Sequence, residues 1–417
     1  MQKFRIVLAI SMLAVCSGAL NKANAQFWNM NKGGDELNTV SAAVTFTMLS
    51  PDARAGSMGD AGVSSAPDAN SMHWNPAKYA FIDSDMGFAV NYTPWMRSLV
   101  KDINLAYVSG FKRIDKNSAF AASLTYFSLG DITFTNDVGT DLGIYRPNEF
   151  TLDGTYSRKF SDKISGAVAG RFIYSNLTQG QDVGGASTHA GISVAADIAM
   201  YYTTPLDFKN MSGGSFNFGV NISNIGSKIS YSDANTDKDF IPTNLRFGPS
   251  LTMDIDDYNS ITIMIDINKL LVPTPPEYYD DSFNLDNEAV IKYGMDPNVS
   301  PIQGILQSFY DAPGVYDDET GDQLLGTFQE EMRELQISTG VEYWYDKQFA
   351  LRGGYFYEHA TKGGRQYFTV GAGLKYNVFG LDFSYLIPIG QRNPLENTLR
   401  FSLIFDFDAF QNQNKRY

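Results

Sequence analysis

The feature that most constrains this chain is a series of segments of about ten residues in which apolar and polar side chains alternate, and fourteen of them follow its first 85 residues. A period of two is typical of β-strands whose two faces meet different surroundings. No stretch beyond the N-terminal region contains the roughly 18 uncharged apolar residues of a membrane-spanning helix. The pattern therefore predicts an all-β protein, a fourteen-stranded antiparallel transmembrane β-barrel.

The lengths of the connections support a barrel over the alternative, a soluble all-β secreted protein. Short turns at 161–162, 255–258, 346–347 and near 377–378 alternate with long connections at 130–147, 177–188, 227–242 and 270–332. Bacterial outer-membrane barrels sort their loops in this way, with short turns in the periplasm and long loops outside. The predicted strands are 86–93, 101–111, 117–129, 148–160, 163–176, 189–204, 214–226, 243–254, 259–269, 333–345, 348–358, 365–377, 379–387 and 399–407.

The alternation also predicts which side chains face lipid. Three strands have clear apolar rows: Ile103, Leu105, Tyr107 and Phe111; Leu335, Ile337, Val341 and Tyr343; and Leu399, Phe401, Leu403, Phe405 and Phe407. We expect these rows to face outer-membrane lipid. The opposite faces make the lumen polar, through Asp102, Asp197, Arg246, Asp266, Glu342, Lys375, Asp382 and Arg400.

The N-terminus has the pattern of a secretory signal peptide. Lys3 and Arg5 precede an apolar stretch at 6–16, and Ala23-Asn24-Ala25 fits the small-residue rule for cleavage after Ala25. Cys16, the single cysteine, is preceded by Val15, which is bulky for a lipoprotein site. We expect residues 1–25 to be removed and the mature protein to be integral to the outer membrane.

Between the signal and the first strand lies a glycine-rich segment, 51–81, suited to close backbone packing. Gly56, Gly59 and Gly62 recur every third residue, Asp60 adds a side-chain acceptor, and Asn75-Pro76 fixes a turn. On its own the segment would be a surface loop. Ahead of a wide polar barrel it predicts a lumen plug over residues 26–85, with Trp74 supplying bulk and the barrel following at 86–410.

The connection at 270–332 carries most of the acidity of the chain. It holds thirteen acidic residues and one basic residue, Lys292, while the whole chain has a net charge of −14. This balance disfavours nucleic acid as a partner and indicates either cationic surfaces or simple solubility. Ser300-Pro301 followed by Ile302, Ile305, Leu306 and Phe309 predicts a short capped helix with one apolar face. The loop either caps the barrel or merely shields its rim.

Motifs for catalysis or metal binding are weak. The only histidines are His73, His189 and His359, and removal of the signal leaves no cysteine. Residues 233–239 begin like a calcium loop, but Lys238 stands at the glycine position and Asn244 at the glutamate position. No nucleophile elbow or phosphate loop occurs. We expect no enzyme activity, metal or cofactor.

The N-terminal motif resembles a known family. Asn75-Pro76-Ala77 ahead of fourteen strands is similar to the FadL family, whose N-terminal segment is a hatch. The longer pattern, with Asp52, Arg54, Gly56, Gly59, Asp60, Gly62, Trp74, Asn75 and Pro76, resembles its narrower PorV branch, from the type IX secretion system of Bacteroidetes.

The resemblance implies a non-enzymatic protein transport component at the cell surface. It would bind C-terminal signal domains of secreted proteins, receive them from the secretion translocon barrel, and carry them to a surface attachment complex with a sortase-like protease. The alternative is a FadL-like transporter of hydrophobic small molecules. That function requires an apolar pocket and a lateral opening, for which Gly213-Gly214 and Gly353-Gly354 are the only sequence hints.

Overall fold

The computed structural model describes residues 37–407, apart from 99, 136–138, 140, 182–186, 233–237, 284–288, 318–319, 321 and 391–392. The chain divides into two units, Met1–Asn38 and Thr39–Tyr417, and nearly all described residues belong to the second. The predicted signal peptide lies outside the described residues.

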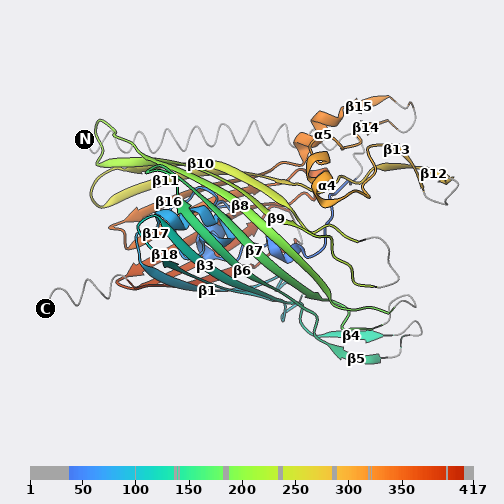
Figure 1. The fold of residues 1–417 in the computed structure, drawn as a ribbon, viewed down its shortest axis with the longest axis horizontal. Coiled ribbons are helices and arrows are strands. Elements are labelled where there is room, and N and C mark those ends of the chain that lie inside the picture. Colours follow the sequence, from blue (N-terminus) through green and yellow to red (C-terminus); the bar gives the residue numbers. More distant parts are fainter. Residues whose placement is uncertain are drawn as a thin grey trace. The chain divides into compact units, whose positions relative to one another are not determined.

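Fourteen antiparallel strands form a closed barrel, as the alternation predicted (Figure 1). Each strand pairs with its neighbour along the chain, and β1 closes the barrel by pairing with β20, with Phe88 opposite Phe405. The strands are β1 (Met86–Pro94), β2 (Asn104–Arg113), β3 (Ser118–Ser128), β6 (Asn148–Lys159), β7 (Ile164–Asn176), β8 (Gly191–Pro205), β9 (Gly213–Gly226), β10 (Asn244–Asp254), β11 (Asn259–Leu270), β16 (Gln336–Tyr345), β17 (Phe349–Tyr357), β18 (Gln366–Tyr376), β19 (Phe379–Pro388) and β20 (Leu399–Asp406).

The long connections gather at one end of the barrel and carry small elements of their own (Figure 1). Within the described residues, no helix combines the length and hydrophobicity needed to cross a bilayer. The outer elements are β4 (Ile132–Thr135), β5 (Asp141–Tyr145), β12 (Glu277–Phe283), β13 (Ala289–Tyr293), α4 (Pro301–Gln307), β14 (Val315–Tyr316), β15 (Gln323–Leu325), α5 (Thr327–Arg333) and η4 (Ala360–Lys362). Because α5 occupies Arg333, β16 starts three residues later than predicted.

The outward rows on β16 and β20 are confirmed, but the row on β2 was assigned to the wrong face. Ile337 and Phe401 are exposed on the wall, whereas Leu105, Tyr107 and Phe111 are buried and Val108 between them is exposed. The Phe111 ring stacks on Tyr79 of the N-terminal segment, with 5.6 Å between ring centroids. The apolar face of β2 turns inward because apolar protein surface inside the barrel covers it.

Six of the eight predicted lumen charges lie inside the wall. Five are buried, namely Asp197, Asp266, Glu342, Asp382 and Arg400, and the Arg246 side chain is 12% exposed. The other two were placed wrongly. Asp102 is exposed in the loop before β2, and Lys375 is exposed near the β18–β19 turn, 3.8 Å from Asp406. Both stand near strand ends, where alternation no longer defines a lumen face.

Most of residues 39–85 lies inside the barrel, while residues at both ends of this range are exposed (Figure 1). We refer to residues 39–85 as the lumen segment. It contains η2 (Thr45–Met48), α2 (Ala53–Gly56), α3 (Ser71–Trp74) and η3 (Pro76–Phe81). Its residues make hydrogen bonds to eleven of the fourteen wall strands, namely β1, β2, β6, β7, β8, β9, β10, β11, β16, β18 and β20.

Candidate functional site

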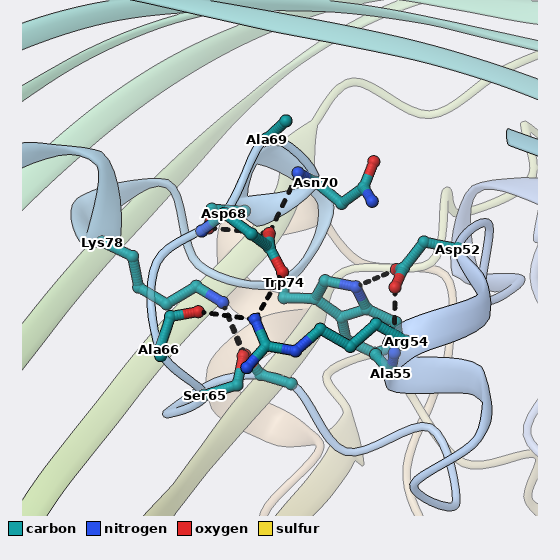
Figure 2. A network of polar contacts seen from close by, with 12 residues as sticks. Asp52, Arg54, Ala55, Ser65, Ala66, Asp68, Ala69, Asn70, Trp74 and Lys78 are labelled. Carbon is teal, nitrogen blue, oxygen red and sulfur yellow. Dashed lines mark hydrogen bonds and ion pairs between the residues drawn. The ribbon is translucent and has the colours of Figure 1, made fainter. Parts of the chain in front are cut away.

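The first part of the site is the start of α2, where Asp52 ties two parts of the lumen segment together. Asp52 is the N-cap of α2 and accepts a hydrogen bond from the Ala55 amide at 2.9 Å. Its other carboxylate oxygen accepts from the Trp74 indole nitrogen at 2.6 Å (Figure 2). One buried side chain thus caps α2 and holds the last residue of α3.

Arg54 connects the lumen segment to the wall. Its guanidinium forms a bidentate pair with Glu342 on β16, at 3.0 and 2.8 Å. It also reaches Asp68 of the lumen segment at 2.8 Å (Figure 2). Glu342 in turn pairs with Arg352, which pairs with Asp382. The charges alternate along this buried chain, so that each cation lies between two carboxylates.

The three glycines lie where the lumen segment passes closest to other groups. A Cβ on Gly56 would meet Arg400, one on Gly62 would meet the Trp74 ring, and one on Gly59 would meet the backbone of Tyr355. Gly59 also has a φ of 66°, in the left-handed region that favours glycine.

The wall contributes glycines of its own at the same contacts. Gly340 and Gly354 lie against the backbone of Met58, and Gly371 lies against Ser57. In β17, Gly354 therefore makes room for the lumen segment, whereas a Cβ on Gly353 would meet only the Thr369 carbonyl of β18. The strand pairs continuously with both neighbours at these two glycines.

Asp60 and Gly62 are held by wall side chains. Asp60 accepts a hydrogen bond from the Tyr367 hydroxyl at 2.5 Å and lies 3.4 Å from the Arg400 guanidinium. The amides of Gly62 and Val63 both donate to one oxygen of Asp266, at 2.7 and 2.8 Å. Two backbone donors on one carboxylate fix the segment against β11.

The Asn75-Pro76 turn starts η3 as its residue types predict. The Asn75 side-chain oxygen accepts from the Ala77 amide, and Pro76 occupies the first turn of the helix. The Asn75 amide group also donates to the carbonyls of Val63 and of Met200 on β8, both at 3.0 Å. Lys78 donates to the Gly62 carbonyl at 2.9 Å. All nine predicted motif residues thus lie in one connected region of the lumen segment.

The cavities beside the lumen segment are small and polar. Two cavities, each with room for about one water molecule, share Thr47, His73 and Arg171 as lining residues. Asp153 and Tyr107 line the first, and Asn224 and Arg246 line the second. Sequence reasoning missed Arg171, Asp153 and Arg352, although each falls on the inward parity of its strand.

A second cluster anchors the long acidic loop to the outer rim, and we call it the rim hub. Its cations are Lys269 on β11 and Lys362 on η4, and its anions are Glu330, Glu331 and Glu334, at or just after α5. The four ion-pair distances lie between 2.7 and 3.1 Å, and all five side chains are buried. Part of the loop acidity is therefore paired internally.

Asp311 extends the rim hub toward the loop interior. It is buried and accepts from the Thr274 amide, while its other oxygen has no hydrogen-bond partner among the described residues. Burial, followed by the nearby charge of Glu331, raises the pKa of Asp311 to about 6. Burial also raises the pKa of Glu331. The hub thus holds more carboxyl groups than cations.

The predicted helix in this loop is confirmed as α4. Ser300 caps it by accepting from the Gln303 amide, and Pro301 is its first residue. Its predicted apolar face does not cap the barrel, because Ile302 and Leu306 are exposed while Gly304 and Gln307 are buried.

The remaining sequence candidates do not form a site. Within the described ranges, no cluster of three His, Cys, Asp or Glu side chains is arranged to hold a metal ion. His73 is packed edge-on against Trp74, and His359 caps η4 by accepting from the Thr361 amide. Residues 233–237 of the calcium-like stretch lie outside the described residues.

A closed fourteen-stranded barrel with an apolar outer wall and a polar, occupied lumen defines an integral outer-membrane barrel protein. Residues 32–277 match the family described as type IX secretion system protein PorV, and the chain belongs to this family. It is therefore an outer-membrane component of the type IX secretion system.

Solved structures with a similar fold are distant. The toluene transporter TodX of Pseudomonas putida is 11% identical, with 88% of this chain and 98% of that chain covered and a TM-score of 0.44. A FadL homologue of Pseudomonas aeruginosa is also 11% identical, with 89% and 100% covered and a TM-score of 0.40. These values carry no conclusion about substrates. The comparison with curated proteins gave no match.

Proposed function

We propose that this protein binds the C-terminal signal domains of exported proteins at its outer loops. It receives them from the secretion translocon barrel and carries them to the surface attachment complex with its sortase-like protease, without catalysing a reaction itself. The observation that carries the proposal is the long loop between β11 and β16, which is fastened to the rim by buried ion pairs. A fixed outer surface suits recognition of a folded domain, which takes about 800 Å² per partner.

The lumen supports this function over transport of hydrophobic small molecules. A hydrophobic solute needs an apolar pocket. Arg171, Asp153 and Asn224 line the cavities described beside the lumen segment, and hydrogen bonds tie that segment to most of the wall.

Deletion of residues 275–325 tests the proposal. The deletion spares α5 and both hub lysines, so we expect the barrel to insert normally while co-purification of proteins with the C-terminal signal is lost. Capture that survives the deletion would move the binding surface to the other outer loops. A purified barrel that ignores signal domains and takes up hydrophobic ligands would be a transporter.

The plug role of residues 26–85 is part of the same proposal. Trp74→Ala removes the hydrogen bond to Asp52, and Pro76→Gly loosens the start of η3. Both changes should raise ion conductance in a planar bilayer, and a wild-type barrel that already conducts freely would contradict the plug. N-terminal sequencing of the mature protein tests cleavage near Ala25.

A further inference from the structure

The two outer helices, α4 and α5, are amphipathic in the reverse of the usual sense. Helices of soluble proteins turn their apolar stripe toward the core. Here α4 buries Gly304 and Gln307, and α5 buries Glu330 and Glu331. The apolar side chains face outward instead, with 47 to 73% of each exposed at Ile302 and Leu306 of α4, at Phe328 and Met332 of α5, and at Leu324 just before α5.

Both helices lie close to the same buried group, Lys269 of the rim hub. The Lys269 ammonium lies 6.0 Å from the centroid of the Phe309 ring, just after α4, and 2.7 Å from Glu331 of α5. The Ala312 amide, in the link that follows α4, donates to Glu331 at 3.0 Å. The polar contacts of the hub therefore keep the apolar faces of α4 and α5 turned away from it.

The buried side of α4 is adapted to this orientation. A Cβ on Gly304 would meet the Phe240 ring and Pro273, so only glycine lets the helix lie this close to the rim. The Gln307 side-chain amide donates to the Asp296 carbonyl at 2.9 Å. With this side of α4 turned to the rim, Ile302 and Leu306 stay 71% and 62% exposed.

From these contacts we infer that the outward faces of α4 and α5 form a docking surface for a protein domain that presents apolar side chains bordered by lysine and arginine. The inference rests on the proposed function in that the partner meets the outer loops, and it adds where the partner binds and with what chemistry. Exposed apolar surface of this kind marks interaction sites in soluble regions of proteins.

Charge distinguishes such a partner from a membrane surface and from a second copy of the chain. Residues 271–335 carry fourteen acidic and two basic residues. Helices that lie on membranes place Lys and Arg on their polar face, whereas the polar face of α5 is acidic and buried. Two copies of this loop would repel each other. A partner with lysine and arginine around its apolar surface is attracted by the negative potential of residues 271–335.

Site-specific photo-crosslinking tests the surface in the full-length protein in native outer membranes. The probe is p-benzoylphenylalanine at position 306 and, separately, at position 328. Phe160 serves as the matched control, because it is 71% exposed on the short turn at the opposite rim. We expect 306 and 328, but not 160, to crosslink to one protein, through a peptide in which an apolar residue is flanked by Lys or Arg.

Adducts with lipid only, with a second copy only, with an acidic peptide, or with nothing would each overturn the inference. As a second measurement, the Leu306→Ser/Phe328→Ser variant, which carries no probe, should co-purify at least about tenfold less of the partner that the crosslinks identify. Because both positions are exposed, we expect the variant barrel to fold. Unchanged heat-modifiable electrophoretic mobility would show that it does.

The outcome also separates this inference from the proposed function. If signal domains bind the double variant as well as the unchanged protein, the docking surface is wrong and the proposed function stands. If the crosslinked partner has the expected chemistry but no C-terminal signal, the docking surface stands and the signal-domain function fails.

Discussion

Replacing Lys269 by methionine should release the acidic loop from the rim. The Lys269 ammonium lies 2.7 Å from a carboxylate oxygen of Glu331 and 2.7 Å from one of Glu334, and all three side chains are at most 5% exposed. Methionine keeps most of the length of lysine and removes the charge. Lys362 still pairs with Glu330 and Glu334, but no second lysine of the hub reaches Glu331 among the described ion pairs.

The expected loss follows from the burial of that carboxylate. Removing one partner of a buried ion pair costs about 3–5 kcal/mol, because the other charge stays buried and unpaired. Lys362 still neutralises part of the hub, so we take the lower end, about 3 kcal/mol. At about 1.4 kcal/mol per factor of ten, the opened form of the loop should become roughly 100-fold more populated.

Limited proteolysis of outer-membrane vesicles measures this population. When the loop opens and closes faster than the protease cuts it, the cleavage rate is proportional to the population of the opened form. The readout is the rate of cleavage within residues 271–335. Heat-modifiable electrophoretic mobility of the barrel shows that each variant is folded. Lys292→Met is the matched control. Its pair with Glu277 is about one-third exposed on both sides, and loss of such a pair costs at most about 1 kcal/mol. Equal cleavage rates in the two variants would refute the role of the hub.

Three further outcomes are expected. The buried Asp311 carboxyl, with its pKa raised to about 6, holds a proton that the opened loop gives up, so the loop should resist proteolysis better at pH 5 than at pH 7.5. Asp311→Asn should reduce that difference and leave the part that comes from Glu331, whose pKa burial also raises. Gly354→Val should displace the lumen segment from β17 and raise ion conductance in a planar bilayer. Gly353→Val should leave the conductance unchanged, because a Cβ there makes only an ordinary contact. Equal conductances of the two variants would contradict the close packing at Gly354. The mature protein should resist alkaline extraction from outer membranes, and recovery as a soluble periplasmic protein would refute the membrane barrel.

The strand number and the sorting of the loops could be predicted because both depend on local sequence. Alternation identifies a strand whatever lies on its two sides, and short turns such as 255–258 interrupt it clearly. Local sequence was less informative at the junction of 333 and 336, where α5 runs almost directly into β16.

The orientation of β2 could not be predicted in the same way. Period two separates two faces of a strand, but it does not say which face meets lipid when the lumen is also filled with protein. Phe111 packs on Tyr79, and Tyr107 contacts His73, so the apolar face of β2 has a protein partner inside. Identifying that partner requires knowing where the lumen segment lies.

The motif residues were predicted as a group, and their individual partners were not. Glycine spacing indicated close packing, which Gly59 shows by its φ and its contact with Tyr355. The pairing of Arg54 with Glu342 joins residues 288 positions apart, and no local pattern specifies it. Arg352 could have been found from the parity of β17, since Ala350 faces the same way.

The pairings also bear on whether the lumen can open. Arg54 shares Glu342 with Arg352, which also pairs with Asp382. Removing the lumen segment would therefore leave the buried carboxylates of Glu342 and Asp382 with Arg352 as their one cation among the described ion pairs. Asp266 would lose two backbone donors at the same time, and water would have to replace bonds on eleven strands. No single contact holds the lumen segment in the barrel, because its hydrogen bonds and ion pairs act together. The binding that we propose therefore takes place outside the lumen, on loops that are anchored to the rim at Lys269 and Lys362.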